Sequence, residues 1–330
     1  MEKVTLGKSD LKVTPIAFGA WAIGGWMWGG TDKKDALDAL EFSIDNGITT
    51  IDTAPIYGFG DSEEIVGEVI NRRRDKVELL TKFGMKWDSN KGDYYFDTVD
   101  NNGNPLKVFK YAAAESVIKE CEVSLKRLKT DYIDLYQIHW PDVTTPVEET
   151  MEAVEKLIQQ GKVRAAGVSN YDLSLTMKAS ESLDIVSNQL PYSMLRRDIE
   201  KDLLPWCSDH DISILAYSPL QRGLLTGKIK PGYKFGEGDS RPNMPHFSHG
   251  NIIKVNEFLS GIEPLAKEKN ATIAQLVIAW TLAQKGISVA LVGARNRKQV
   301  AENLKAGSIK LSDKEVDDIT LKLNELKLEL

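Results

Sequence analysis

Cysteine, histidine and metal-binding motifs are scarce in this sequence. Its 330 residues include only two cysteines and four histidines. So few cysteines exclude a disulfide-stabilised secreted scaffold, and we expect a reducing, cytoplasmic location. No H-E-x-x-H or C-x-x-C motif occurs, so we expect no metal site. The one close histidine pair, His246 and His249, lies in a segment rich in proline and glycine and is interpreted as a solvated loop.

Long apolar runs and excess positive charge are also missing. No stretch approaches the ~20 apolar residues of a membrane helix, and no basic-plus-apolar leader opens the chain. The net charge of −6 at pH 7 argues against nucleic acid or an anionic membrane as a partner. Nothing in the sequence specifies a homo-oligomer. We therefore expect a small-molecule partner.

Strand-like apolar runs alternate with helical patterns along almost the whole chain. The runs are TPIAFG, TTIDTA, VELLTKFG, YIDLYQIHW, VRAAGVSN, DIVSNQLPY, SILAYSPL and ISVALVG. This alternation predicts parallel βαβ units closed into one (β/α)8 TIM barrel domain over residues 1–330, with an open doubly wound sheet as the alternative. A β-hairpin turning at residues 7–9 would cap the barrel, and extra helices would end the chain.

The last of these helices has its own signature. Ser312 and Glu315 fit a capping box at its start. One apolar stripe is then formed by Val316, Ile319, Leu323, Leu326 and Leu330.

Two connections, residues 84–113 and 219–250, are too long to be simple joints. Both leave the C-terminal ends of predicted strands, where barrel enzymes carry their chemistry. We therefore interpret them as covers over a substrate or a cofactor.

Chemically capable side chains stand at or just after three of the strand ends. Asp52 ends the second strand, Tyr57 follows in its loop, Lys82 ends the third strand and His139 ends the fourth. Because these ends meet at one face of a barrel, we expect the four side chains to lie together. Asp52 would hold and neutralise Lys82, and the Lys82 ammonium would lower the pKa of the Tyr57 phenol toward the operating pH, as a general acid requires.

A dinucleotide fingerprint is the competing interpretation of the same stretch, IDTAPIYGFGDSE. Gly58 and Gly60 match the first two glycines of G-x-G-x-x-G, but Glu63 stands in the third position. A pyrophosphate would then meet carboxylates at the helix start, so we reject this interpretation.

A second set of polar residues follows the remaining strands. Strand-end amides and an aromatic ring suit the edge and the face of a nicotinamide: Ser169, Asn170, Asn188, Gln189, Tyr217 and Ser218. The loop after the last strand leads directly into a helix and carries Gly293, Arg295, Arg297 and Lys298. It is either a phosphate site or a basic helix start on the surface, and Arg222 and Lys228 in the preceding loop favour phosphate.

Blocks of sequence in this order resemble the aldo-keto reductase family, in particular its bacterial general-stress and potassium-channel-β-like branches. The blocks are FGAWAIGG, IDTAPIYGFGDSEEIVG, LLTKFG, SLKRLKTDYIDLYQIHWPD, GKVRAAGVSN, YSPLQRGLLTGK and VGARNRKQVAENLKA. The resemblance covers nearly the whole chain. It implies a (β/α)8 barrel that binds NADPH without a Rossmann domain and reduces small aldehydes and ketones.

The resemblance also implies roles for single residues. Asp52, Tyr57, Lys82 and His139 match the family's catalytic tetrad, in which Tyr57 would protonate the carbonyl oxygen while nicotinamide C4 supplies a hydride to the carbon. The implied NADPH/NADP+ contacts are Ser169, Asn170, Gln189, Tyr217, Ser218, Leu220, Arg222, Gly223, Lys228, Gly293, Arg295, Gln299 and Asn303.

Two departures from the family pattern modify these expectations. Where well-known members have a Lys-Ser pair and then an Arg at the adenosine 2′-phosphate, this chain has Gly293-Ala294 and Gln299, so Arg295 would have to bind that phosphate. The tail that closes over the substrate in many members is also missing, which implies a more open pocket. Its expected walls are Trp21, Trp26, Trp28, Trp87 and Trp140.

Two other functions fit some of these features. A non-catalytic or redox-sensing NADP(H)-binding regulatory protein would keep the cofactor site, and the family includes such channel-associated subunits. A barrel lyase would use Lys82 to form a Schiff base with its substrate.

Overall fold

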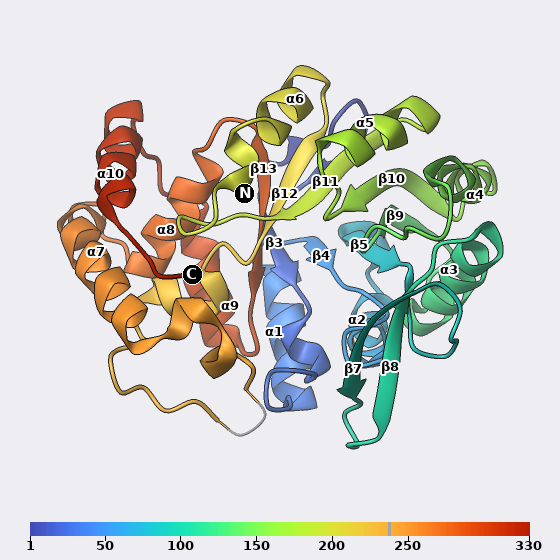
Figure 1. Cartoon of the computed structure of the whole chain (residues 1–330), viewed down its shortest axis with the longest axis horizontal. Helices are drawn as coiled ribbons and strands as arrows, with labels where there is room; N and C mark the ends of the chain where they lie inside the picture. The colour runs from blue at the N-terminus through green and yellow to red at the C-terminus, as the bar shows by residue number, and fades with distance from the viewer. Residues whose placement is uncertain (237–238) are drawn as a thin grey trace.

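Eight parallel strands close into a barrel in the computed structural model, which describes residues 1–236 and 239–330 (Figure 1). In chain order each strand pairs with the next, and the last returns to the first. The predicted (β/α)8 barrel is confirmed, and the open sheet is wrong. The barrel strands are β3 (Ile16–Gly19), β4 (Thr50–Asp52), β5 (Glu78–Phe83), β9 (Ile133–Ile138), β10 (Val163–Ser169), β11 (Ile185–Pro191), β12 (Ser213–Tyr217) and β13 (Ile287–Gly293).

Helices surround the barrel and cover its outer face (Figure 1), while inward side chains such as Leu80, Leu135 and Leu215 fill its interior, so both faces of the strands are covered. This is why the strands read as nearly continuous apolar runs, and every residue of β9 is buried. The helices are α1 (Lys33–Asp45), α2 (Asp61–Ile70), α3 (Ala114–Leu128), α4 (Val147–Gln159), α5 (Leu173–Ser182), α6 (Leu203–Asp209), α7 (His249–Glu268), α8 (Ile273–Leu282), α9 (Arg297–Ala306) and α10 (Asp313–Glu325).

The C-terminal helix α10 begins as its sequence predicts. The Ser312 side chain accepts a hydrogen bond from the Glu315 amide, and the Glu315 side chain accepts one from the Ser312 amide. Ile319 and Leu323 are buried against the barrel helices. The predicted apolar stripe is wrong at its end, because the helix stops at Glu325 and Leu330 is 70% exposed.

The predicted N-terminal hairpin closes the barrel at the N-terminal ends of its strands. Strands β1 (Val4–Thr5) and β2 (Lys12–Val13) pair antiparallel, and the Gly7 amide donates to Ser213 Oγ at 3.0 Å. Leu6 and Leu11 pack with barrel-interior side chains such as Leu215. The hairpin plugs this end, so an open site must lie at the opposite, C-terminal end.

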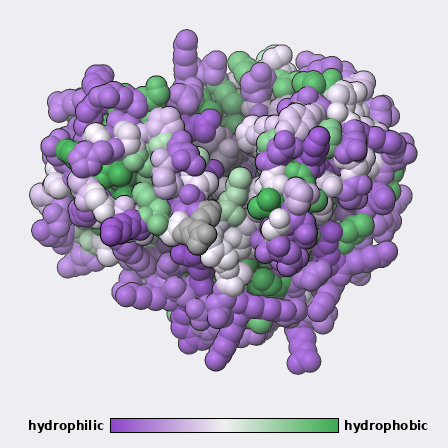
Figure 2. Space-filling model, turned by 60° about the horizontal axis from the view of Figure 1, so that its bottom comes forward, coloured by the Kyte–Doolittle hydropathy of each residue, from purple (hydrophilic) through white to green (hydrophobic). Residues whose placement is uncertain are grey.

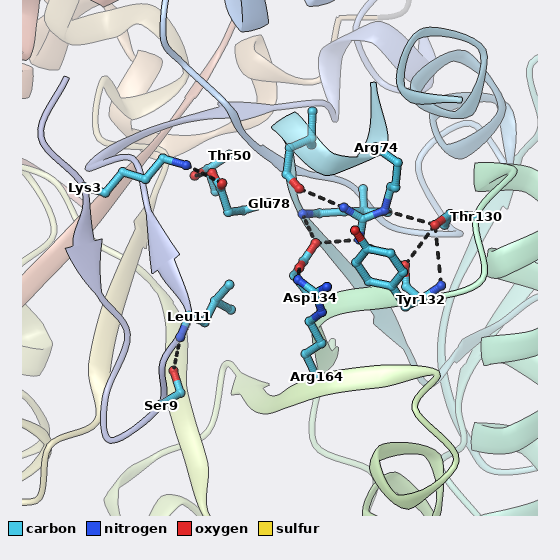
Figure 3. A network of polar contacts seen from close by, with 12 residues as sticks. Lys3, Ser9, Leu11, Thr50, Arg74, Glu78, Thr130, Tyr132, Asp134 and Arg164 are labelled. Carbon is cyan, nitrogen blue, oxygen red and sulfur yellow. Dashed lines mark hydrogen bonds and ion pairs between the residues drawn. The ribbon is translucent and has the colours of Figure 1, made fainter. Parts of the chain in front are cut away.

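A network of charged side chains strengthens the same plugged end (Figure 3). Asp134 accepts hydrogen bonds from Arg74 at 2.5 Å, from Arg164 at 2.8 Å and from the Leu79 amide at 2.9 Å. The two guanidinium groups lie 3.8 and 4.1 Å from the centre of the Tyr132 ring. These contacts tie β5, β9 and β10 together, and since each charge has a partner the network is structural.

The connection 84–113, predicted as a loop, is a small antiparallel sheet. It consists of β6 (Met85–Lys86), β7 (Asp93–Val99) and β8 (Pro105–Lys110) in the order β6-β8-β7, and we call it the hairpin arm. Trp26, in the loop after β3, donates from Nε1 to Thr98 Oγ1 at 3.1 Å and stacks on Phe96. The arm is thereby fixed over the C-terminal end of the barrel.

The other long connection, 219–250, contains short 3-10 turns in its described part. The first covers Gln221–Thr226, and its Arg222 and Gly223 have left-handed backbone angles. Two more, Arg241–Asn243 and Pro245–Phe247, precede α7.

The surface has no large apolar area on the face drawn in Figure 2, where hydrophobic residues form small separate groups among hydrophilic ones. No helix within residues 1–236 and 239–330 is both long and apolar enough to cross a membrane.

One buried carboxyl gives the fold a pH dependence. Glu120 of α3 accepts hydrogen bonds from the Gly84 amide at 3.0 Å and from Ser116 Oγ at 2.9 Å. Burial raises the pKa of this carboxyl from 4.5 to about 7. Between these values the folded protein keeps a proton that the unfolded chain has lost, so the stability contributed here falls as the pH rises, by up to about 1.4 kcal/mol per pH unit.

We expect Glu120→Gln to flatten this pH dependence because glutamine does not titrate. The free energy of unfolding, measured with denaturant at pH 5.5 and 7.5, should fall less with pH in the variant than in the wild type. Glu122→Gln, at a half-exposed position of the same helix that pairs with Lys162, is the control and should leave the slope unchanged. Equal slopes for Glu120→Gln and wild type would contradict the prediction.

Candidate active site

The four predicted catalytic side chains come together at the C-terminal end of the barrel. Lys82 is fully buried, and its Nζ donates to Asp52 Oδ1 at 2.6 Å and to the Thr53 carbonyl at 3.0 Å. The same Nζ lies 3.3 Å from the Tyr57 hydroxyl. The His139 ring stands edge-on to the Tyr57 ring at 5.6 Å. A phenol is therefore held between a cation and an imidazole.

A tight turn after β4 delivers Tyr57 to this position. The Tyr57 amide donates to the Ala54 carbonyl, and Gly58 follows with φ of +68°. A Cβ on Gly58 would lie 2.2 Å from the Gly24 carbonyl oxygen, so only glycine fits this close approach. Gly60, with φ of +112°, is the left-handed N-cap residue of α2. The two glycines thus shape the turn and the helix start that follows it.

The ionisation of the site differs from the sequence expectation. Burial raises the pKa of Tyr57 well above its usual value, and the Asp52 charge adds to this effect. The expectation that Lys82 lowers the pKa of Tyr57 is therefore wrong for this state. Desolvation disfavours the charged phenolate more than the nearby ammonium favours it. At neutral pH the phenol keeps its proton and can donate it.

The two basic groups of the site are shifted in the opposite direction. Burial lowers the pKa of Lys82, although the Asp52 carboxylate opposes the shift. Burial and the Lys82 charge hold the pKa of His139 well below its usual value. His139 is neutral at physiological pH, and its Nδ1 is buried without a hydrogen-bond partner in residues 1–236 and 239–330. The imidazole is thus a hydrogen-bonding group and not a second cation.

Amide side chains connect the tetrad to the neighbouring strand ends. Gln189 donates from Nε2 to Asp52 Oδ2 at 2.8 Å. Asn170, in the left-handed conformation, donates to the His139 carbonyl at 2.9 Å and accepts from the Tyr217 hydroxyl at 2.8 Å. Asn188, by contrast, donates to the Tyr171 carbonyl and Thr176 of α5, so it faces outward and does not belong to the rim.

A single cavity of about 520 Å³ joins these groups to the loops after β12 and β13. Asp52, Tyr57 and His139 are among the described residues that line it. Lys82 is fully buried and lies beneath the cavity floor. Every cofactor contact that the resemblance implies lies on its wall: Ser169, Asn170, Gln189, Tyr217, Ser218, Leu220, Arg222, Gly223, Lys228, Gly293, Arg295, Gln299 and Asn303.

Four cations from the loops after β12 and β13 line the cavity, and they differ in their partners. Lys228 pairs with Glu302 at 3.0 Å, and Arg241 pairs with Asp239 at 2.5 Å. Arg222 and Arg295 have no carboxylate partner within the described chain. The latter two retain charge for an anionic ligand.

Two other cations predicted from the sequence, Arg297 and Lys298, are not among the described residues that line the cavity. Arg297 instead donates two hydrogen bonds to Asp38, at 2.6 and 3.1 Å. The segment after β13 therefore contributes Arg295 to the cavity wall, whereas Arg297, two residues later, lies on the surface of the protein.

Aromatic rings wall the cavity above the tetrad. Of the five predicted tryptophans, Trp21, Trp26, Trp28 and Trp140 line it, and Trp21 stacks against Tyr57 at 5.9 Å. The prediction for Trp87 is wrong for the described cavity wall, because this side chain packs on Phe59 and lies over Arg127.

Sequence reasoning missed the contribution of the hairpin arm to this wall. Tyr95 and Phe96 of β7 line the cavity, and the Tyr95 ring lies 5.4 Å from the Trp140 ring. The strand DYYFDTV mixes charged and aromatic residues, so it gave no apolar run. The signal that could have found it was the unusual length of the connection. Arg241 was missed because it lies in a polar segment without a pattern.

Comparison with known proteins agrees with this picture over nearly the whole chain. A model of the aldo/keto reductase family matches residues 15–324. The aldo-keto reductase YhdN of Bacillus subtilis is 40% identical over 305 residues, which cover 91% of this chain and 87% of that protein. An NADH-specific methylglyoxal reductase of Escherichia coli is 38% identical over 321 residues, covering 95% of each.

Solved structures of related proteins share the fold of this chain. A glycerol dehydrogenase from Gluconobacter oxydans superposes with a TM-score of 0.88 at 36% identity, covering 98% of this chain and 96% of that one. An aldo-keto reductase from Klebsiella pneumoniae in complex with NADPH superposes with a TM-score of 0.71 at 30% identity, covering 96% and 93%.

Proposed function

Because the chain belongs to the aldo-keto reductase family of oxidoreductases, we propose that it reduces small aldehydes and ketones with NADPH and catalyses the reverse oxidation. The observation that carries this proposal is the Tyr57 hydroxyl, held 3.3 Å from the Nζ of a lysine that Asp52 anchors at 2.6 Å. An acid of this kind at the floor of an aromatic cavity suits a neutral carbonyl substrate.

The cavity fits a nicotinamide dinucleotide in its shape and its polar groups. The amides of Asn170 and Gln189 lie on the wall beside the tetrad, where a flat carboxamide would find hydrogen-bond partners. The Tyr217 ring, also on this wall, offers a face for stacking. Arg222 and Arg295, also on the wall, are suited to phosphate groups.

The reaction follows from what each side chain can do. When bound, the reduced nicotinamide supplies a hydride to the carbonyl carbon. Tyr57 gives its proton to the carbonyl oxygen, and the Lys82 ammonium stabilises the phenolate that remains. Neutral His139 orients the carbonyl oxygen by a hydrogen bond, and Asp52 keeps Lys82 charged and in place. The tryptophan walls exclude water from the reacting atoms.

Turnover of 4-nitrobenzaldehyde tests the proposal and separates it from the two alternatives. Loss of NADPH absorbance that depends on the aldehyde supports a reductase. NADPH binding without turnover of this or other aldehydes would favour a non-catalytic or redox-sensing regulatory protein. Trapping of a substrate adduct on Lys82 by borohydride would favour a Schiff-base lyase, which the burial of Lys82 beneath the cavity floor disfavours.

We expect Arg295→Ala to weaken NADPH binding without weakening NADH binding. Arg295 lies on the cavity wall, and among the described residues its guanidinium donates a hydrogen bond only to the Trp28 carbonyl, at 3.4 Å, so it is available to a 2′-phosphate. A charged hydrogen bond contributes about 1.5–3 kcal/mol, so the NADPH dissociation constant should rise about 10–100-fold. Fluorescence titration with both cofactors measures this difference.

Arg297→Ala is the matched control, because Arg297 pairs with Asp38 away from the cavity wall and should change neither dissociation constant. Equal losses for NADPH and NADH in Arg295→Ala, or no loss, would show that the 2′-phosphate is held elsewhere. Arg222 would then be the next candidate, since it lies on the wall and has no carboxylate partner within the described chain.

A further inference from the structure

A buried amide that this reaction does not use lies directly beside Asp52. Gln137 is fully buried in β9, with its Nε2 3.5 Å from Asp52 Oδ2. Its Oε1 accepts a hydrogen bond from Gln189 Nε2 at 3.4 Å. Gln137 is not among the described residues that line the cavity, so it would touch neither substrate nor cofactor.

The position of Gln137 is unfavourable for packing alone. Leu135, two residues earlier and on the same side of β9, belongs to the apolar interior of the barrel with Leu80 and Leu215. An amide at such a place costs free energy unless it finds hydrogen-bond partners, and a leucine would fill the space without that cost. The partners of Gln137 in the described chain are Asp52 and Gln189. The amide therefore serves the tetrad and not the core.

The neighbouring strand leaves room for this side chain. Gly167 of β10 pairs in register with Gln137 on one side and with Ser187 on the other. A Cβ on Gly167 would lie 3.1 Å from Gln137 Cγ and 2.6 Å from Ser187 Oγ. Gly167 is not among the glycines with positive φ, so its backbone does not require glycine. The missing side chain provides space for Gln137.

We propose that Gln137 is a positioning residue for carbonyl reduction, which with Gln189 fixes the Asp52 carboxylate so that its Oδ1 faces Lys82. Two amide groups bind one carboxylate oxygen, and the lysine binds the other. Lys82 in turn stands against the Tyr57 hydroxyl. This inference rests on the proposed function and extends it to a residue outside the cavity.

Other charged or titratable groups around the carboxylate come from several elements. Lys82 faces it from β5, Tyr57 from the turn after β4, and His139 stands at the end of β9. Glu63 of α2 acts on Lys82 from the far side. A pH profile therefore reports on the whole group, and comparison of variants isolates the contribution of Gln137.

The first test compares Gln137→Leu and Gln137→Glu with the wild type, using NADPH and 4-nitrobenzaldehyde. Gln137→Leu removes the donor and keeps the bulk, so kcat should fall about tenfold while KM for both substrates changes less than about twofold. Gln137→Glu adds a like charge beside Asp52, so the acid limb of the kcat profile should move up by about one pH unit or more. Gly167→Ala should act in the same direction as Gln137→Leu, because it displaces the Gln137 stem.

Asn188→Leu is the matched control. It removes a buried amide from β11, another strand of the barrel, but this amide binds Tyr171 and Thr176 and not the tetrad. It should lower Tm and leave kcat and the pH profile unchanged. If both Gln137 variants behaved like Asn188→Leu, Gln137 would be a packing residue and the inference would be wrong.

A readout independent of turnover separates this inference from the proposed function. The titration of Lys82, followed by NMR of its ¹³Cε and assigned by its loss in Lys82→Met, should move to lower pH in Gln137→Leu, because the carboxylate no longer faces the ammonium. An inactive wild type in which this shift occurs would overturn the proposed function alone. An active wild type without the shift, and with unchanged kcat in both variants, would overturn the inference alone.

Discussion

Tyr57→Phe should lower kcat for carbonyl reduction by about 10²–10⁴-fold, the range that a positioned general acid contributes. The phenylalanine ring keeps the contacts of the tyrosine ring with Trp21 and His139, so the cavity wall stays intact. Only the hydroxyl beside Lys82 Nζ disappears. Steady-state kinetics with 4-nitrobenzaldehyde measures the loss.

The same variant should bind NADPH with nearly unchanged affinity, because the implied cofactor contacts lie elsewhere on the wall. Fluorescence titration checks this point. Tyr94→Phe provides the control, since Tyr94 is 51% exposed on β7 and removal of its hydroxyl should not affect kcat. If Tyr57→Phe kept more than a tenth of the wild-type kcat, Tyr57 would not be the acid.

The barrel and the tetrad could be predicted because local sequence carries enough information about both. Apolar runs such as those of β9 and β13 are long and buried on both faces, and turns and caps such as the Ser312 box separate the helices from them. Parallel strands bring their C-terminal ends to one face of the barrel. The position of a polar residue at a strand end therefore follows once the strand has been recognised. No distance was needed to place Asp52 beside Lys82.

Other features depended on long-range contacts that a sequence pattern does not carry. Trp87 and Trp140 both follow strand ends, but of these two only Trp140 lines the described cavity. Trp87 packs against Phe59 and Arg127 instead. Tyr95 reaches the wall from an irregularity in the pairing of β7 with β8, between Tyr94 and Phe96. The direction of the Tyr57 pKa shift also depends on burial, which residue types alone do not give.

The polar interior explains how the site tolerates a fully buried lysine. An isolated ammonium at the position of Lys82 would be strongly disfavoured. Asp52 supplies the opposite charge, and the Thr53 carbonyl supplies a further acceptor. The remaining carboxylate oxygen is bound by the amides of Gln137 and Gln189. The charge needed beside the phenol is therefore held in place before any ligand binds, which is the preorganisation that catalysis requires.

Asp52→Asn should remove that support and affect both stability and catalysis. Breaking a buried ion pair by removing one partner costs about 3–5 kcal/mol, because the other charge is left uncompensated. The amide would also present N–H groups toward donors on Lys82 or Gln189. We expect the free energy of unfolding to fall by this amount at pH 6, and by less at pH 9, where Lys82 can relieve the cost by losing its proton.

The catalytic effect has a defined sign. Burial already lowers the pKa of Lys82, and Asp52 is the main influence that opposes it. Without the carboxylate the pKa falls further, so the ammonium that stabilises the Tyr57 phenolate is lost at lower pH. The kcat profile should drop by about 10²-fold, and its alkaline limb should move toward neutral pH. Asp38→Asn, which breaks the exposed pair with Arg297, should change neither the profile nor the stability by more than about 1 kcal/mol. A profile and an unfolding free energy for Asp52→Asn that match those of Asp38→Asn would show that the buried pair does not control Lys82.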